Sequence, residues 1–330
     1  MNVLYTCDNN YIWLMGISAI SLFENNKDIH DLTVYLLGEG ISEENKKVLH
    51  ELGEQYERKI KIIDVPYFDI PNSLVSARWP LSAFTRLFSA NLLPDEIEKI
   101  LYLDCDTIIN GSISELDKVD VSGKVFLGVK DCIGKKYKEN IGLKFNDAYI
   151  NAGVLLINFK RLRKIDVAEK IEQYLQKFLY LINYADQDIL NGTFKNEIGT
   201  LNPKYDVMTI EAVYSYNDIK LLRRPVNYYS EIEISEAVKK PIIIHYTTNM
   251  RTIRPWFSNS NHPFVEVFRK YLAMSPWKNK KLDDFKFKSR ESWLIGLIQI
   301  LPNKIACSLL GLIHAEIKPN VIRWRTINGK

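Results

Sequence analysis

The feature that most constrains the fold is a series of short, continuous apolar runs separated by helix-like segments. Three of these runs have the length of a strand and lack polar alternation: Ile100–Leu103, Val125–Val129 and Val154–Ile157. Such runs are typical of strands buried on both faces of a mainly parallel sheet. Further runs of this kind alternate with helical patterns near the N-terminus, at Val3–Thr6, Thr33–Leu37 and Ile60–Val65. This alternation predicts an open α/β sheet of the nucleotide-binding kind.

Local signals place helices between the runs. Ser42 followed by two glutamates is typical of a helix start, because serine caps the first turn and acids suit the positive end of the helix dipole. Another helix is predicted over Ala83–Leu93, ended by Pro94. The sequence contains neither GxGxxG nor a P-loop motif, which argues against a dinucleotide fold and a P-loop ATPase.

Composition adds a boundary near the C-terminus. A hydrophobic content of 46% is enough for a sizeable core, so disorder is excluded. The net charge of +4 is uneven: Trp277–Lys330 carries 11 Lys and Arg against 4 Asp and Glu, or +7, which leaves −3 on the rest. We therefore expect a folded α/β domain over 1–276 and a basic, amphipathic segment over 277–330.

The cysteines and the N-terminus bear on the compartment. Cys7, Cys105, Cys132 and Cys307 form no CxxC pair, which argues against a disulfide framework and a cysteine zinc site. We expect them to be buried, reduced thiols of a cytosolic protein. The N-terminus has no basic region before its first apolar run and is not expected to be a signal peptide.

Two carboxylates follow the run that ends at Leu103. Asp104 and Asp106 stand two residues apart, and on a strand such side chains share a face. They would repel each other unless a cation lies between them, and oxygen ligands favour Mg²⁺ or Mn²⁺ held with substrate phosphates. His245, after the apolar Ile242–Ile244, is a candidate third ligand. The plainer alternatives are a solvated acidic turn and a structural histidine.

With these residues in view, the sequence resembles glycosyltransferase family 8, which includes bacterial lipopolysaccharide galactosyl- and glucosyltransferases and the glycogenins. The resemblance runs from about Met1 to Trp277 and rests on separate blocks in the family's order: Cys7–Tyr11, Thr85–Leu87, Leu101–Asp106, Asn151–Leu155, Asp186–Asn191 and His245–Thr247. It implies the GT-A fold, a UDP-sugar donor, Mn²⁺ (with Mg²⁺ possible) and retention to an α-glycosidic bond.

The resemblance also implies residue roles. Asp8 would accept the uracil N–H, with Asn10 and Tyr11 near the base and ribose. Asp104, Asp106 and His245 would hold the metal, and Asp106 would approach the ribose. The sugar pocket and the donor's diphosphate would involve a further set: Arg86, Asp131, Asn151, Asp186 and Gln187.

Each block also has a purely structural explanation. Asp8 and its neighbours could form a turn after a strand. Asn151 could belong to a tight turn, Arg86 could lie on a solvated helix face, and Gln187 could be an ordinary polar residue at a helix start capped by Asp186. The occurrence of all the blocks in order favours the functional interpretation.

One segment departs from the family pattern. Members usually continue from the His-Tyr pair through a glycine to Lys-Pro-Trp, and the lysine neutralises the diphosphate. Here the segment is longer, the glycine is missing and Arg254 precedes Pro255-Trp256. Arginine can also bind phosphate, so Arg254 is the candidate, with Arg251 in reserve.

The predicted activity is transfer of galactose or glucose to a cell-surface glycan acceptor, which could be lipopolysaccharide, a capsule unit or a protein-linked glycan. Retention leaves two routes, a double displacement with a nucleophile at Asp186 or Gln187 and a same-face attack; we favour the latter because no well-placed carboxylate nucleophile is evident. The alternatives are a non-catalytic UDP-sugar or carbohydrate-binding protein of the same fold and a nucleic-acid-binding protein, and no nucleic-acid motif is present.

The C-terminal segment allows two interpretations. The basic stretch Lys278–Arg290 precedes two largely apolar pieces that Pro302-Asn303-Lys304 separates, each too short to span a bilayer. They suit peripheral attachment to an anionic membrane surface, which would place the enzyme on the inner face of the bacterial plasma membrane near a lipid-linked acceptor. Alternatively, two helices cover the back of the catalytic domain.

Overall fold

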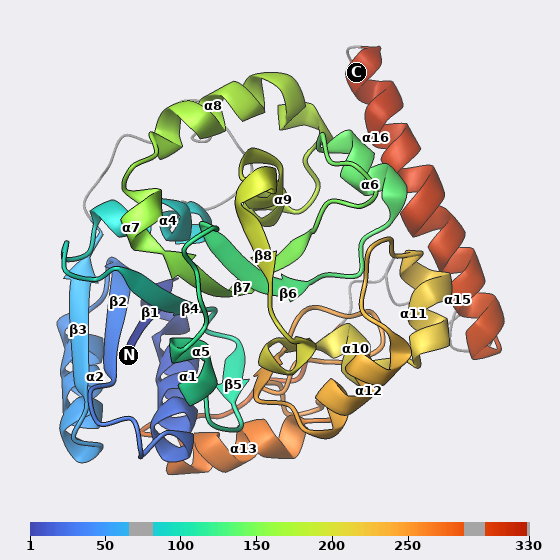
Figure 1. Ribbon diagram of the computed structural model, residues 1–330. Coiled ribbons are helices and arrows are strands. Elements are labelled where there is room, and N and C mark those ends of the chain that lie inside the picture. The colour runs from blue at the N-terminus through green and yellow to red at the C-terminus, as the bar shows by residue number, and fades with distance from the viewer. Residues whose placement is uncertain (66–81, 287–300, 329–330) are drawn as a thin grey trace.

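The computed structural model describes residues 1–65, 82–286 and 301–328. Its centre is a seven-stranded sheet in the order β3-β2-β1-β4-β7-β6-β8. Neighbouring strands are parallel except where β7 pairs with β4 and β6. The sheet is therefore open and mainly parallel, which confirms the predicted fold class (Figure 1). Its strands are β1 (Asn2–Asp8), β2 (Thr33–Glu39), β3 (Lys59–Asp64), β4 (Lys99–Leu103), β6 (Phe126–Lys130), β7 (Ile150–Asn158) and β8 (Ile198–Thr200).

Helices cover both faces of this sheet. Successive strand residues point to opposite faces, so Tyr5 packs in one buried cluster with α1 and α13, while Leu4 packs in another with α4, α8 and α9. The helices are α1 (Ile12–Asn25), α2 (Glu43–Gln55), α4 (Ser82–Phe88), α5 (Ser114–Asp117), α6 (Lys135–Asn140), α7 (Phe159–Leu162), α8 (Val167–Phe178), α9 (Ala185–Thr193), α10 (Thr209–Val213), α11 (Tyr216–Arg223), α12 (Glu231–Lys239), α13 (Val265–Met274), α15 (Asn303–Gly311) and α16 (Lys318–Ile327).

Local details follow the sequence signals closely. The Ser42 hydroxyl accepts a hydrogen bond from the backbone N–H of Asn45, which confirms the predicted cap of α2. The helix predicted over Ala83–Leu93 is shorter, because α4 ends at Phe88 and a 3₁₀ turn follows over Ser89–Asn91. All four cysteines lie in the described ranges, where they are free and buried.

A second, three-stranded sheet lies beside the end of β4. It has the order β5-β10-β9, formed by β5 (Thr107–Ile109), β10 (Ile243–His245) and β9 (Val207–Met208). β10 runs antiparallel to β5 and parallel to β9. Because β5 starts almost directly after β4, this small sheet carries β10 to the carboxyl end of the large sheet, where open α/β folds bind their ligands.

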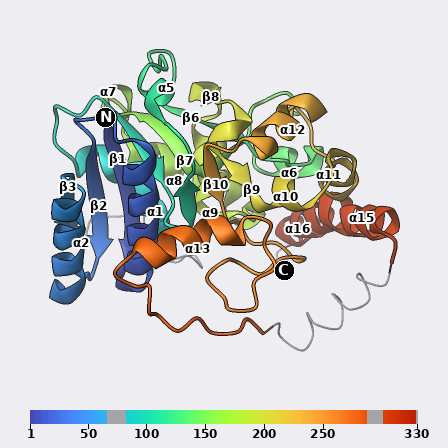
Figure 2. The ribbon, with the colours of Figure 1, turned by 90° about the horizontal axis from the view of Figure 1, so that it is seen from below.

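The C-terminal residues pack on the rest of the chain. Trp277 lies so close to Gly16 of α1 that a Cβ there would be 2.3 Å from the indole. Farther on, α15, a π-helical turn at Leu312–Ile317 and α16 form one helix from Asn303 to Ile327 that runs along α11 (Figures 1 and 2). The predicted apolar piece before Pro302 lies largely outside the described residues.

This terminal helix is more continuous than the sequence interpretation assumed. By length and composition it is long and apolar enough to cross a membrane, since its most apolar 18-residue window has a mean hydropathy of 1.3, and 28% of that window is buried. Its inner side contacts α11, so the packing expected of a covering helix is observed for this part of the segment. Attachment to a membrane stays a prediction.

Candidate active site

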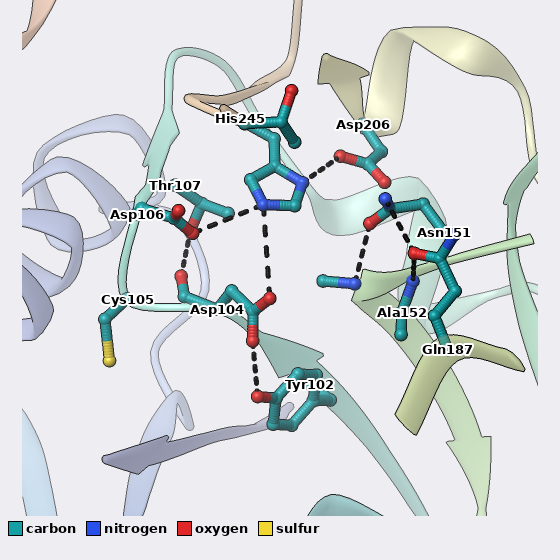
Figure 3. A network of polar contacts seen from close by, with 12 residues as sticks. Tyr102, Asp104, Cys105, Asp106, Thr107, Asn151, Ala152, Gln187, Asp206 and His245 are labelled. Carbon is teal, nitrogen blue, oxygen red and sulfur yellow. Dashed lines mark hydrogen bonds and ion pairs between the residues drawn. The ribbon is translucent and has the colours of Figure 1, made fainter. Parts of the chain in front are cut away.

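The two acids of the predicted metal site lie in a turn directly after β4. The backbone N–H of Thr107 donates to the carbonyl of Asp104, which closes the turn, and β5 follows. The argument that the two side chains share a strand face was therefore wrong, since neither residue belongs to a strand. The turn nevertheless points both carboxylates to the same place, where His245 meets them (Figure 3).

The geometry of these three side chains suits a divalent cation. His245 Nε2 lies 3.2 Å from Asp106 Oδ1 and 4.0 Å from Asp104 Oδ2, and the candidate ligand atoms all lie within 4.8 Å of one another. Two ligands at about 2.1 Å from one octahedral ion lie about 3 to 4.2 Å apart. The side chains are thus close enough to share one ion with small adjustments.

A buried carboxylate orients the histidine from behind. His245 Nδ1 lies 3.0 Å from Oδ1 of Asp206, which is fully buried (Figure 3). Burial would lower the pKa of His245, but Asp206 and Asp106 raise it well above the usual value in the protein without metal. A carboxylate on the second ring nitrogen fixes the imidazole so that Nε2 faces the ligand site. Sequence reasoning missed Asp206.

Gly153 makes this approach sterically possible. A Cβ at this position of β7 would lie 2.2 Å from Cε1 of His245 and 2.8 Å from Oδ2 of Asp104. The Gly153 carbonyl also accepts the Asp104 backbone N–H at 2.7 Å. Because Gly153 of the Asn-Ala-Gly block has no side chain, His245 and Asp104 can both approach the backbone of β7 closely.

Arg86 connects the acidic turn to the next part of the site. It is buried at the end of α4, so the alternative of a solvated helix face was wrong. Its Nη2 pairs with Asp104 Oδ1 at 3.0 Å, its Nε with Asp186 Oδ2 at 3.2 Å, and its Nη1 donates to the carbonyl of Ala152. One guanidinium thus pairs with two acids that are 82 residues apart in the sequence.

Gln187 joins the remaining predicted residues. Its Oε1 accepts hydrogen bonds from Asn151 Nδ2 at 3.1 Å and from the Ala152 N–H, and its Nε2 donates to Asp131 Oδ2 at 2.9 Å. The alternative that Asp186 caps this helix start was wrong, because Tyr184 is at the cap position of α9, with no side-chain cap hydrogen bond, and Asp186 lies inside the helix. Asn151, Asp131 and Gln187 therefore form one network.

The largely buried carboxyl of Asp186 has a raised pKa. Burial raises its pKa, Arg86 lowers it, and nearby Asp104 raises it again, to about 6. Asp106 shows the opposite balance, since burial alone would raise its pKa, but His245 and Arg254 hold it below the usual value. The site thus separates its acids by environment, a feature common to functional sites.

Arg254 reaches the site from the loop after β10. Its Nη2 donates to Thr248 Oγ1 at 2.6 Å and lies 3.7 Å from Asp106 Oδ2. The reserve candidate Arg251 points elsewhere, since its Nη2 donates to Asn303 Oδ1 at the start of α15. The structure therefore places Arg254, and not Arg251, beside the acids.

These side chains line a cavity of about 290 Å³: Arg86, Asp104, Asp106, Asn151, Ala152, Gly153, Tyr184, Asp186, Gln187, His245, Thr247, Thr248 and Arg254. A wider hollow of about 700 Å³ lies between α1 and the end of α2. Its Arg58 already donates to the carbonyls of Ile29 and His30. The smaller cavity holds the candidate metal ligands and the buried ion pairs of Arg86, and it is the candidate active site.

Asp8, Asn10 and Tyr11 are not among the residues that line this cavity. Asp8 ends β1, and Asn10 and Tyr11 lie in the 3₁₀ turn after it. Because β1 pairs in parallel with β4, all three lie at the same end of the sheet as the acidic turn. Asp8 Oδ1 accepts the Asn10 N–H at 2.8 Å, as expected of a turn former, and Tyr11 is 47% exposed. Their predicted contact with a base stays a prediction.

The matches to known proteins agree with this geometry. A family model described as glycosyl transferase family 8 matches residues 2–260. The chain belongs to glycosyltransferase family 8. A lipopolysaccharide 1,2-glucosyltransferase of Escherichia coli is 29% identical over 287 residues, which cover 84% of this chain and 79% of that protein. General stress protein A of Bacillus subtilis is 25% identical and covers 84% and 94% of the two chains.

A solved structure supports the fold of the family member described here. The galactosyltransferase LgtC, in complex with donor and acceptor sugar analogues, superposes with a TM-score of 0.72 at 23% identity, covering 85% of this chain and all of that chain. This likeness confirms the GT-A fold. The predicted family and fold are thus confirmed, and the structure brings Asp104, Asp106 and His245 together as a DxD-type metal site requires.

Proposed function

We propose that the protein is a retaining, metal-dependent transferase that moves galactose or glucose from a UDP-sugar to a cell-surface glycan. The observation that carries this proposal is the convergence of Asp104, Asp106 and His245 beside a cavity that Arg86, Asp186 and Gln187 line. Membership of the family and relatives that include lipopolysaccharide 1,2-glucosyltransferases and a 1,3-galactosyltransferase support the choice of hexose donor and glycan acceptor.

Asp104, Asp106 and His245 would hold Mn²⁺, or Mg²⁺ in its place. When bound, such an ion acts as a Lewis acid on a diphosphate and stabilises the charge that a departing UDP develops. Arg254 lies 3.7 Å from Asp106 and supplies a second positive charge at the same end of the cavity, from a side chain that can bind phosphate bidentately. We infer that Asp8, Asn10 and Tyr11 hold the uridine at the neighbouring end of β1.

The sugar would lie against Asp186, Gln187 and Asn151. Asp131 is not among the residues that line the cavity and would act through its hydrogen bond with Gln187. Gln187 is held by four hydrogen bonds, so its amide is fixed in orientation, as pre-organised catalysis requires. Asp186 is paired with Arg86. Because this carboxylate is already engaged by a buried guanidinium, we favour a same-face attack, in which the departing phosphate takes the acceptor's proton, over a double displacement.

Replacing Asp186 with Asn tests its role. We expect kcat to fall strongly, by about a hundredfold or more if the carboxylate stabilises only the transition state, while the affinity for UDP changes little. Steady-state turnover of the UDP-hexose and calorimetric titration of UDP with Mn²⁺ measure the two effects. If both fell together, Asp186 would belong to the donor-binding shell.

We further infer that the protein works on the inner face of the bacterial membrane, with a lipid-linked acceptor. The outer side of the Asn303–Ile327 helix exposes large apolar side chains, among them Ile305, Leu309, Ile313 and Ile317. Lys304, Lys318, Arg323 and Arg325 add positive charge along it. This combination suits an anionic lipid surface.

The deciding experiment is a panel of UDP-sugars with and without chelator, read as UDP release, together with calorimetric binding of UDP with and without Mn²⁺. We expect turnover of one UDP-hexose that EDTA abolishes and Mn²⁺ restores. UDP binding without turnover of any donor would instead indicate a non-catalytic binding protein. Neither binding nor turnover would refute the proposal.

A further inference from the structure

The C-terminal helix fits closely against the catalytic domain. Its inner side consists of small, buried residues, including Ala306, Cys307 and Ala315. At Gly311 the contact is so close that a Cβ would lie 1.9 Å from the carbonyl oxygen of Leu221 on α11. Asn140 Nδ2 also donates to the carbonyl of Pro319 at 2.9 Å. The helix therefore has a defined position relative to α11 and α6.

One polar side chain points from this helix into the domain. His314 lies in the π-helical turn, and its Nε2 is 2.6 Å from Arg223 Nη1 and 3.1 Å from the Tyr184 hydroxyl. Arginine has no acceptor, so His314 Nε2 must accept the Arg223 hydrogen bond and is unprotonated. Burial and the adjacent Arg223 lower the pKa of His314 to about 3, in agreement with this geometry.

Arg223 depends on these partners. Its Nη1 also lies 3.3 Å from the Tyr184 hydroxyl, whereas its Nε is buried and has no hydrogen-bond partner within the described residues. Among the described residues, loss of His314 would leave the Tyr184 hydroxyl as the hydrogen-bonded neighbour of this cation. Uncompensated buried charge is costly, so the side chains around it would rearrange.

Tyr184 links this cluster to the cavity. It lines the cavity and directly precedes Ala185, which has a positive φ of 44°, and Asp186. Its backbone N–H is fixed by Asp188 Oδ2 at 2.7 Å. Its hydroxyl is fixed at the other end by Arg223 and His314, so the ring is held from both sides.

We propose that His314 is a positioning residue: through Arg223 and Tyr184, the C-terminal helix sets the wall of the sugar pocket beside Asp186. This inference rests on the proposed function and deepens it, because it makes the terminal helix part of the active-site architecture. The substrate class concerned is the hexose of the donor, since Tyr184 lies with the sugar-side residues and the uridine contacts are expected at β1.

The test compares four full-length variants with the wild type: His314→Ala, His314→Gln, Tyr184→Phe and the double variant of His314→Ala with Tyr184→Phe. Glu316→Gln is the matched control, because Glu316 lies on the same helix and pairs with Lys136 and Arg224 at the surface. The measurements are kcat and KM for the UDP-hexose, the Kd of UDP with Mn²⁺, and the midpoint of thermal unfolding.

We expect His314→Ala to lower kcat/KM for the UDP-hexose by about tenfold to a hundredfold, as small misplacements of a positioned group do, and to leave the Kd of UDP unchanged. The glutamine variant keeps an acceptor for Arg223 and should restore part of the activity. The double variant should be no worse than His314→Ala alone, because both changes break one linkage. Glu316→Gln should behave as the wild type.

The inference is overturned if a folded His314→Ala protein has wild-type kcat/KM, or if the two single losses multiply in the double variant. A parallel rise in the Kd of UDP would also overturn it, because that indicates a general structural defect. If His314→Ala does not fold, the glutamine variant and Tyr184→Phe still decide the outcome. A wild type that turns over no UDP-sugar would refute the proposed function itself and this inference with it.

Discussion

At the scale of single residues, the site combines side chains that could be predicted from the sequence with side chains that could not. Asp104, Asp106 and His245 could be predicted because each follows an apolar run that ends at the ligand-binding edge of the sheet. Asp206 could not, since no motif connects it with a histidine 39 positions away in number. Arg86 was predicted as a ligand of the donor, but its pairing with both Asp104 and Asp186 depends on tertiary packing alone.

The space beside Gly153 gives a first prediction. Gly153→Ala would place a methyl group 2.2 Å from the ring of His245, so the imidazole must move away from the acids. We expect Mn²⁺-dependent UDP binding to weaken at least tenfold, as measured by calorimetry. Gly123→Ala is the control, because a Cβ there meets nothing within 4 Å. Unchanged binding in the Gly153 variant would mean that His245 is not a ligand.

The buried Asp206 carboxylate behind His245 gives a second prediction. Asp206→Asn keeps the size of the side chain but removes the charge that holds His245 with Nε2 toward the site. Removal of such outer partners typically weakens metal affinity 10- to 100-fold. Titration of Mn²⁺ in the presence of UDP, with the exposed Asp120→Asn as control, measures this change. Equal affinities for both variants would contradict the proposed orienting role.

Because the Glu211 carboxyl is buried, we predict that the stability of the protein depends on pH. Burial raises the pKa of this carboxyl to about 8, although Tyr228 and the Met208 N–H lower it. The folded state therefore binds the proton more tightly than the unfolded chain, and this stabilisation is complete below about pH 4.5 and lost as pH rises through about 8. In urea unfolding, Glu211→Gln should gain stability relative to the wild type over that window. A difference that does not change with pH would refute the shift.

At the scale of helices and strands, the sequence predicted which helices and strands exist better than it predicted the direction of a strand or the continuity of a helix. Val154–Ile157 was predicted as a buried strand, but β7 runs antiparallel to β4 and β6, and a continuous apolar run does not encode direction. The C-terminal helix is continuous from Asn303 to Ile327, and a π-turn at Leu312–Ile317 lies inside it. In an uninterrupted α-helix Ile317 would lie about 120° around the axis from Ile305. The wider π-turn rotates less per residue and returns Ile317 toward the exposed apolar side.

At the scale of the whole molecule, one helix has two different sides. Its inner side contacts α11 and carries His314, which contacts Tyr184 at the wall of the cavity, while its outer side is apolar and flanked by basic residues. Removal of all residues after Pro276 would expose the surface of α11 that the helix covers and would remove the contact of Trp277 with Gly16. A truncated variant could therefore lose membrane binding and packing at the same time, and the two effects could not be told apart. Substitutions confined to the outer side separate them.

The double variant Leu309→Glu with Ile313→Glu is the direct test of membrane attachment. These side chains are 50% and 52% exposed, so the fold should tolerate the change, whereas burial of each apolar side chain in lipid would contribute about 1 kcal/mol or more. We expect binding to vesicles with anionic headgroups to weaken at least tenfold, while turnover of the UDP-hexose in solution is unchanged. Ile232→Glu is the control, since Ile232 is 70% exposed on α12, away from this helix. If vesicle binding survives in the double variant, the outer side of the helix is not the attachment surface, because two charges in its apolar centre would prevent insertion.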